Sequence, residues 1–189
     1  MNHSLVARLL GHARIWASRT RILLARATGV EIGSGCMLGA GCDVQLGAAS
    51  ARCGRVVIGP DCTLEQGVIV HPYGGSVIFG RSVYLGPGVV VFGHGGVNIG
   101  DHSLIAMHCR IVSSNHAVPP PGTPIRTMAD VPKATCVGRD VWLGAGVTVL
   151  AGVTIGDGCI VSAGAVVTHD LPANSIAMGV PARVARQRA

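Results

Sequence analysis

The 189-residue chain has few aromatic residues, no apolar segment long enough to span a bilayer, and no Cys-x-x-Cys pair. Aromatic side chains make up 3% of the sequence although hydrophobic residues make up 49%, which predicts a narrow core filled with aliphatic side chains. Five arginines interrupt the apolar stretch at residues 4–27, and no small-residue cleavage site follows it. This stretch therefore predicts neither a transmembrane helix nor a signal peptide.

The basic residues do not point to a nucleic-acid partner. The net charge is +6, but the arginines lie mainly near the two ends of the chain and lack the interleaved aromatic residues on which bases stack. Seven cysteines without a secretory signal favour a reducing compartment, so we expect a cytoplasmic protein. Most thiols are expected to fill the core as small hydrophobes.

Aliphatic residues recur at every sixth position near the C-terminus. On an α-helix with 3.6 residues per turn, side chains spaced six residues apart would point in different directions around the axis. Short strands joined by tight turns instead place one aliphatic side chain per segment on the same inner face. Fixed short periods of this kind indicate a stacked solenoid. The C-terminal series is Val137, Leu143, Val149, Ile155, Val161 and Val167, and earlier sets are Ile32, Leu38, Val44; Ile58, Leu64, Val70; Phe79, Leu85, Val91; and Ile99, Ile105, Ile111.

Three such six-residue units predict one triangular coil, and the sequence contains six sets of three. Every irregular step falls after the third unit, so all insertions should leave the prism at one corner. The expected organisation is an N-terminal helix at 1–29, a β-solenoid of about six coils at 30–171 with a protruding loop at 113–134, and a C-terminal tail at 172–189. One inward column should contain Ile32, Ile58, Phe79, Ile99, Val137 and Ile155.

Residues 1–29 predict a basic amphipathic helix, which has two interpretations. The helix can cover the open first coil, whose strand edges would otherwise be exposed. It can also make peripheral contact with an anionic surface at the inner face of the membrane. The sequence favours the first interpretation and leaves the second open.

Residues 137–186, VGRDVWLGAGVTVLAGVTIGDGCIVSAGAVVTHDLPANSIAMGVPARVAR, closely resemble the terminal signature of hexapeptide-repeat acyltransferases. The resemblance is to the group of maltose, galactoside, nodulation-factor and exopolysaccharide (colanic-acid-type) O-acetyltransferases. It implies an all-β, left-handed parallel β-helix that forms a homotrimer with active sites between neighbouring prisms. It also implies that acetyl-CoA is the cosubstrate, that no metal is required, and that a carbohydrate hydroxyl is the acceptor, in polysaccharide or glycan modification.

The longest insertion, at 113–134, is the expected location of the chemistry because long loops in compact repeats are usually functional. His116 lies at its start, just before a proline run, and matches the general base of the family. An imidazole with an unperturbed pKa near ~6.5 can take a proton from a hydroxyl at neutral pH. The resemblance places Asn115, Trp142 and Gly86 at the acceptor site, although galactoside-type enzymes carry an asparagine near the position of Gly86.

The same resemblance assigns six residues to acetyl-CoA. Main-chain N–H groups near Gly144 and Ala145 are expected to face the oxyanion. The small size of Ala145 and Ala163 would let the pantetheine arm lie against the coils. The nucleotide end is assigned to Thr168, Arg183 and Arg186, with His169 replacing the lysine that frequently follows the threonine.

Other functions remain as alternatives on the same fold. A γ-type carbonic anhydrase would need a second histidine five residues after His94, where Ile99 stands instead. A serine O-acetyltransferase would need a longer N-terminal domain than this chain has. A non-catalytic structural solenoid, and an N-acetyltransferase acting on an amino sugar or a xenobiotic, stay open.

Overall fold

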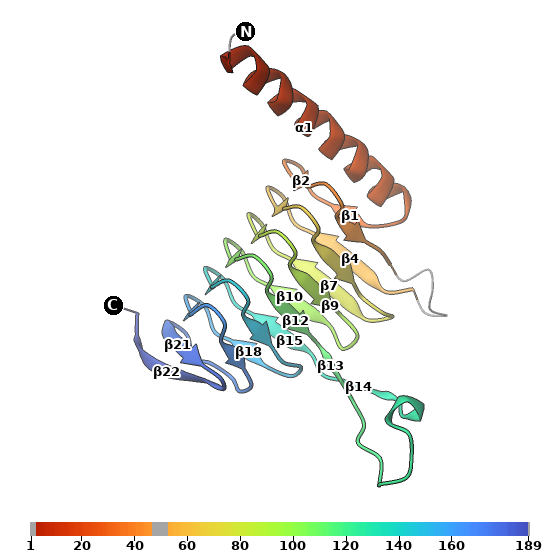
Figure 1. The fold of residues 1–189 in the computed structure, drawn as a ribbon, viewed down its shortest axis with the longest axis vertical. Coiled ribbons are helices and arrows are strands. Elements are labelled where there is room, and N and C mark those ends of the chain that lie inside the picture. Colours follow the sequence, from red (N-terminus) through yellow and green to blue (C-terminus); the bar gives the residue numbers. More distant parts are fainter. Residues whose placement is uncertain (1–2, 47–52, 189) are drawn as a thin grey trace.

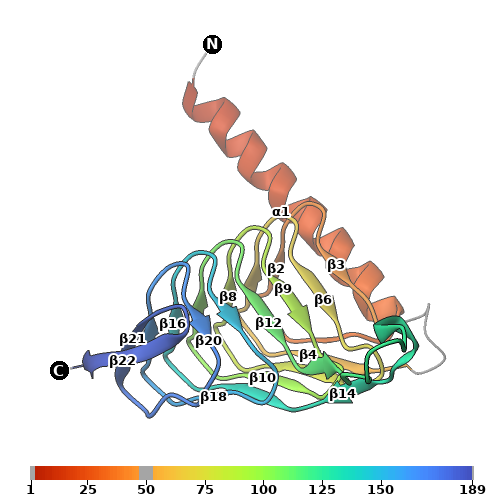
Figure 2. The same cartoon turned by 60° about the horizontal axis from the view of Figure 1, so that its bottom comes forward.

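The computed structural model describes residues 3–46 and 53–188, with side chains from residue 13 onward. The chain winds into a parallel β-helix in which three sheets form the faces of a prism (Figures 1 and 2). A long helix lies across the N-terminal end, and a hairpin closes the C-terminal end. The predicted solenoid is therefore confirmed.

Each coil contributes one short strand to each face. Sheet A contains β1 (Glu31–Ile32), β4 (Arg55–Ile58), β7 (Ser76–Phe79), β10 (Val97–Ile99), β15 (Thr135–Val137) and β18 (Thr154–Ile155). Sheet B contains β2 (Met37–Leu38), β5 (Thr63–Leu64), β8 (Tyr84–Leu85), β11 (Leu104–Ile105), β16 (Trp142–Leu143), β19 (Ile160–Val161), β21 (Ser175–Gly179) and β22 (Ala182–Gln187). Sheet C contains β3 (Asp43–Val44), β6 (Ile69–His71), β9 (Val90–Phe92), β12 (Arg110–Val112), β17 (Thr148–Val149) and β20 (Val166–Val167).

The inward column predicted from the six-residue period is present in sheet A. The ladder pairs Ile32 with Ile58, and the pairing continues from coil to coil up to Ile155. All six members of the column are buried, with at most 9% of any residue exposed. Cys62, Cys109 and Cys159 are also buried in the core, as expected for thiols that act as small hydrophobes.

The insertions leave the prism at a common corner, as predicted. The first insertion lies between β3 and β4 and the longest lies between β12 and β15, and both β3 and β12 belong to sheet C. Part of the first insertion, residues 47–52, lies outside the described residues. The longer insertion forms an arm that projects from the prism (Figure 1), built from β13 (Ser114–His116), the 3-10 helix η1 (Ile125–Thr127) and β14 (Asp130–Pro132).

The C-terminal part of helix α1 (His3–Ala27) packs on the first coil, and its N-terminal part extends beyond the prism (Figure 2). The buried Ser18 hydroxyl accepts a hydrogen bond from the Leu38 N–H at 2.9 Å, and Arg21 donates to the Leu38 C=O at 3.1 Å. Arg26 donates to the Ile32 C=O at 2.6 Å. These bonds satisfy main-chain groups at an edge that would otherwise face water. No helix in the described part of the chain is long and apolar enough to cross a membrane.

The segment expected as a C-terminal tail contains an antiparallel hairpin. Strand β21 pairs in parallel with β19, and β22 folds back against β21 as the last strand of sheet B. Arg188 then donates to the Asp140 carboxylate at 2.8 Å. The hairpin therefore extends sheet B beyond the last complete coil.

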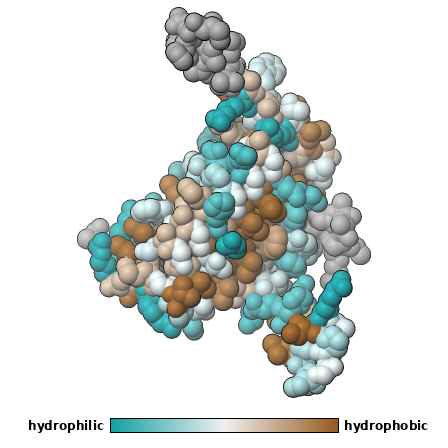
Figure 3. Space-filling model, viewed as in Figure 1, coloured by the Kyte–Doolittle hydropathy of each residue, from teal (hydrophilic) through white to brown (hydrophobic). Residues whose placement is uncertain are grey.

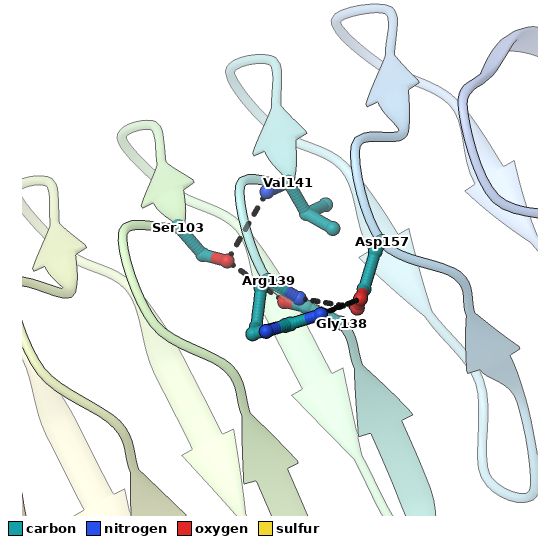
Figure 4. A network of polar contacts seen from close by, with 5 residues as sticks. All are labelled: Ser103, Gly138, Arg139, Val141 and Asp157. Atoms are coloured by element: carbon teal, nitrogen blue, oxygen red, sulfur yellow. Dashed lines mark hydrogen bonds and ion pairs between the residues drawn. The ribbon is translucent and has the colours of Figure 1, made fainter.

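Side-chain bonds join the coils on both sides of the long insertion (Figure 4). The buried Ser103 hydroxyl donates to the Gly138 C=O at 2.9 Å and accepts the Val141 N–H at 3.2 Å. Asp157 accepts bonds from the main-chain N–H and the guanidinium of Arg139. These bonds lower the pKa of Asp157 from its ordinary value. The prism thus forms a fixed base from which the arm projects.

Candidate active site

His116 stands near the base of the projecting arm, on strand β13. The strand pairs with β14 in antiparallel register, which places His116 opposite Asp130. The buried Ser113 anchors the start of the arm, because its hydroxyl donates to the Phe92 C=O and accepts the Gly95 N–H. The His116 side chain is 59% exposed. A rigid strand therefore presents an accessible imidazole at the corner of sheets C and A.

Asp130 contacts two histidines through different oxygens. Its Oδ1 lies 3.3 Å from Nδ1 of His116, and its Oδ2 lies 3.8 Å from Nε2 of His94. When His116 donates its Nδ1–H to this carboxylate, Nε2 keeps its lone pair and can accept a proton. Asp130 was not among the residues predicted from the sequence, because no fixed spacing connects it to His116. Its only signal was an acidic residue on the returning half of the long loop.

An aromatic cluster forms the wall beside this pair. The Tyr73 and His94 rings stack with centroids 4.3 Å apart, and Phe92 meets Tyr73 edge to face at 5.1 Å. Burial lowers the pKa of His94, although Asp130 opposes this shift. Nδ1 of His94 is buried without a hydrogen-bond partner. Burial therefore favours a neutral His94 that serves as an aromatic wall next to Asp130.

The expected acceptor residues lie in two separate places on the chain. Asn115 is exposed on β13 next to His116. Trp142 is half exposed on the outer face of β16 in sheet B, and Gly86 lies at the end of β8 of the same sheet. One chain does not bring these two groups together, because the arm leaves from the end of sheet C.

The residues expected to contact the thioester stack at the turns that follow β16 and β19. Gly164 donates its N–H to the Ala145 C=O at 2.8 Å, which holds Ala145 and Ala163 in neighbouring coils. The Gly144 N–H donates to the Val161 C=O at 2.8 Å, so the ladder already uses it. Among the described residues, the Ala145 N–H has no main-chain acceptor. Of the two amides expected to face an oxyanion, only that of Ala145 is available.

Gly144 contributes through its size. A Cβ at this position would lie 2.5 Å from the Ala163 main-chain nitrogen, closer than real Cβ contacts come. Only glycine therefore permits this spacing between the coils.

The residues assigned to the nucleotide end lie near the C-terminal end of the prism. Thr168 Oγ1 and His169 Nδ1 are 2.8 Å apart. His169 and Arg183 line the same hollow of about 230 Å³. Arg186 is exposed further along the same edge strand, β22. The structure thus brings Arg183 next to His169, the neighbour of Thr168, and places Arg186 on the same edge strand.

No set of three His, Cys, Asp or Glu side chains within residues 3–46 and 53–188 is arranged to hold a metal ion. Asp130 and His116 of the arm face each other, and His94 of the prism approaches the same carboxylate. The chemistry available at this corner is proton transfer by an imidazole supported by a carboxylate.

Sequence comparisons match residues 137–169 to the family model described as bacterial transferase hexapeptide (six repeats). The chain is 32% identical to the putative lipopolysaccharide biosynthesis O-acetyl transferase WbbJ of Escherichia coli K12, across 71% of this chain and 72% of that protein. It is 32% identical to the probable acetyltransferase Rv3034c of Mycobacterium tuberculosis and to the galactoside O-acetyltransferase of Lactococcus lactis. The matches cover 63% and 69% of this chain but only 40% and 62% of those relatives.

Solved structures share the fold at lower identity. The hexapeptide-repeat acetyltransferase VCA0836 of Vibrio cholerae, complexed with acetyl coenzyme A, gives a TM-score of 0.63 at 22% identity, covering 90% of this chain and 78% of that chain. The N-acyltransferase AntD of Bacillus cereus, in complex with dTDP and 3-hydroxybutyryl-CoA, gives 0.73 at 18% identity, covering 89% and 88%. Together with the relatives, these likenesses show that the chain belongs to the hexapeptide-repeat acyltransferase family and has its left-handed parallel β-helix.

Proposed function

We propose that the protein is an acetyl-CoA-dependent O-acetyltransferase that acts on a sugar hydroxyl, with His116 as the general base. The observation that carries this proposal is the exposed His116 imidazole, whose Nδ1 faces the Asp130 carboxylate at 3.3 Å. This contact leaves Nε2 directed away from Asp130 and able to accept a proton. The names of the relatives support acetyl transfer to oxygen, and the acetyl coenzyme A bound to VCA0836 supports the choice of donor.

The transfer proceeds in one displacement. Nε2 of His116 takes the proton of the acceptor hydroxyl while that oxygen attacks the thioester carbonyl of acetyl-CoA. The tetrahedral oxyanion accepts a hydrogen bond from the Ala145 N–H of the site. The C–S bond then breaks, the acetyl ester forms, and the CoA thiolate takes the proton from the imidazolium. Asp130 stabilises that imidazolium while it carries a positive charge.

This mechanism requires two copies of the chain at each site, since His116 and Trp142 lie on different faces of one prism. The outer face of sheet B supports such an assembly. It presents three exposed apolar side chains in register from β8 to β16, namely Tyr84, Leu104 and Trp142, which a neighbouring prism would cover. Met37 lies on the same face at β2, separated from them by Thr63. We infer a homotrimer in which Trp142 of one prism faces His116 of the next. The cysteine content favours a reducing compartment, and we infer a cytoplasmic location.

A panel of carbohydrate acceptors with acetyl-CoA, read by release of the CoA thiol, tests the function. Amino sugars belong in the panel because nitrogen acceptors are the alternative. With an accepted substrate, His116→Asn should lower the rate by about 10²–10⁴-fold, the usual contribution of a general base. His102→Asn is the matched control, because His102 is also exposed and its φ of 60° suits asparagine. A His116 variant that transfers acetyl as fast as the control would remove His116 from the mechanism.

A further inference from the structure

Helix α1 has an outer face that the prism does not cover. Ser18 and Arg21 bond to the first coil, whereas the visible part of the helix in Figure 3 carries hydrophobic and hydrophilic residues side by side. Four large apolar residues of this face are exposed, namely Ile15 (47%), Trp16 (66%), Leu23 (65%) and Leu24 (64%). A solenoid end that only needed covering would not require apolar groups on the solvent side of its cap.

The charge of the protein is concentrated in the same segment. Five of the fifteen basic residues and none of the nine acidic residues lie within residues 1–29, so this segment carries +5 of the net charge of +6. Arg19 lies on the outer face, where its guanidinium stacks over the Trp16 ring at 5.6 Å. An amphipathic helix with arginines beside tryptophan and leucine fits the headgroup region of a bilayer.

We propose that the outer face of α1, defined by Ile15, Trp16, Arg19, Leu23 and Leu24, docks the protein on a membrane surface rich in anionic lipid. The helix lies in the plane of the interface, with the leucines and tryptophan among the upper acyl chains and Arg19 at the phosphates. The inner face continues to cap the first coil. The two interpretations of the N-terminal helix thus describe its two faces.

The positive charge of this segment favours anionic lipid, rather than a second copy of this chain, as the partner of the outer face. Packing α1 against α1 would bring two segments of charge +5 together, which is unfavourable at physiological ionic strength within a Debye length of about 8 Å. Anionic headgroups neutralise the same charges. Sheet B already offers an apolar surface for contact between copies. This proposal does not depend on the acetyl-transfer activity.

Co-sedimentation of the full-length protein with lipid vesicles tests the proposal. We expect binding to phosphatidylcholine vesicles containing about 30% phosphatidylglycerol, and little binding to phosphatidylcholine alone. Arg19→Gln should weaken binding about fivefold, the contribution of one basic residue near the surface. The matched control Arg81→Gln removes an exposed arginine from the prism and should bind like the wild type. The double variant Trp16→Ser, Leu23→Ser should lose binding.

Fluorescence locates the contact. Binding to the anionic vesicles should shift the tryptophan emission to the blue, and Trp16→Phe should abolish the shift while the protein still sediments with the vesicles. The same variants should keep the wild-type mass in light scattering without lipid. Equal binding to both vesicle types, or wild-type binding by the double serine variant, would overturn the proposal. A change of oligomeric state in the double variant would assign the face to contact between copies and would also overturn it.

Discussion

Replacing Asp130 with asparagine separates the carboxylate charge from the shape of the site. Asp130 lies opposite His116 in the β13–β14 ladder, with its Oδ1 3.3 Å from Nδ1 of the imidazole. Asparagine keeps the size of the side chain and an oxygen that can accept the Nδ1–H. The substitution therefore removes mainly the negative charge that faces the imidazolium during transfer.

The geometry sets the size of the effect. Two unit charges 3.3 Å apart attract by about 1 kcal/mol in water and by about 5 kcal/mol at an effective dielectric constant of about 20. His116 and Asp130 have side chains that are 59% and 45% exposed, so solvent screening favours the lower part of this range. A loss of about 1–3 kcal/mol of transition-state stabilisation lowers kcat/KM by roughly 5- to 150-fold.

Steady-state thiol release with an acceptor from the carbohydrate panel measures this loss. Asp130→Asn should lower kcat more than it raises the KM for acetyl-CoA, because the imidazolium exists only after proton transfer. Asp61→Asn is the control, since it removes a carboxylate at a left-handed turn that asparagine tolerates. Asp130→Glu should restore part of the rate. An Asp130→Asn enzyme within twofold of the control would show that the charge plays no part in the transfer.

Three further predictions concern cofactor binding, stability and thiol chemistry. The double variant Arg183→Ala, Arg186→Ala should raise the KM for acetyl-CoA at least about tenfold with less effect on kcat, because each charge-assisted bond to phosphate contributes about 1.5–3 kcal/mol; an unchanged KM would move the phosphate site elsewhere. Ser103→Ala should lower the unfolding free energy by about 1–3 kcal/mol, measured by denaturant unfolding, because a buried N–H loses its acceptor. Burial raises the pKa of the Cys62 thiol to about 11, so at pH 8 a thiol reagent should modify the exposed Cys53 long before Cys62; comparable rates would contradict this burial.

The coil register could be predicted from the sequence because each coil repeats the same physical requirement. An inward position must hold an aliphatic side chain, and Phe79 fits the column between Ile58 and Ile99 in the observed ladder. Insertions at a corner do not shift this column, so the period survives the long arm. A period of six read over six sets carries enough repetition to fix both the fold and the exit corner.

The candidate site was only partly predictable because its contacts depend on how the arm folds back. His116 is close in sequence to the last strand before the arm, so its position could be predicted. Asp130 approaches His116 only because β13 and β14 pair in antiparallel register, and no repeat in the sequence predicts this pairing. Likewise, the Gly144 amide looked available in sequence, but the register of the next coil directs it to Val161.

The orientation of the N-terminal helix also could not be predicted from the sequence. Its composition predicted a basic amphipathic segment but could not tell which residues face the prism, because a cap and a membrane-binding helix use the same alternation. The contacts of Ser18, Arg21 and Arg26 identify the inner face, and the exposure of Trp16 and Leu23 then defines the outer one. Because the two faces are separate, a substitution on the outer face leaves the contacts of the inner face with the prism unchanged. Vesicle binding by the Arg19 variant therefore reports on the outer face alone.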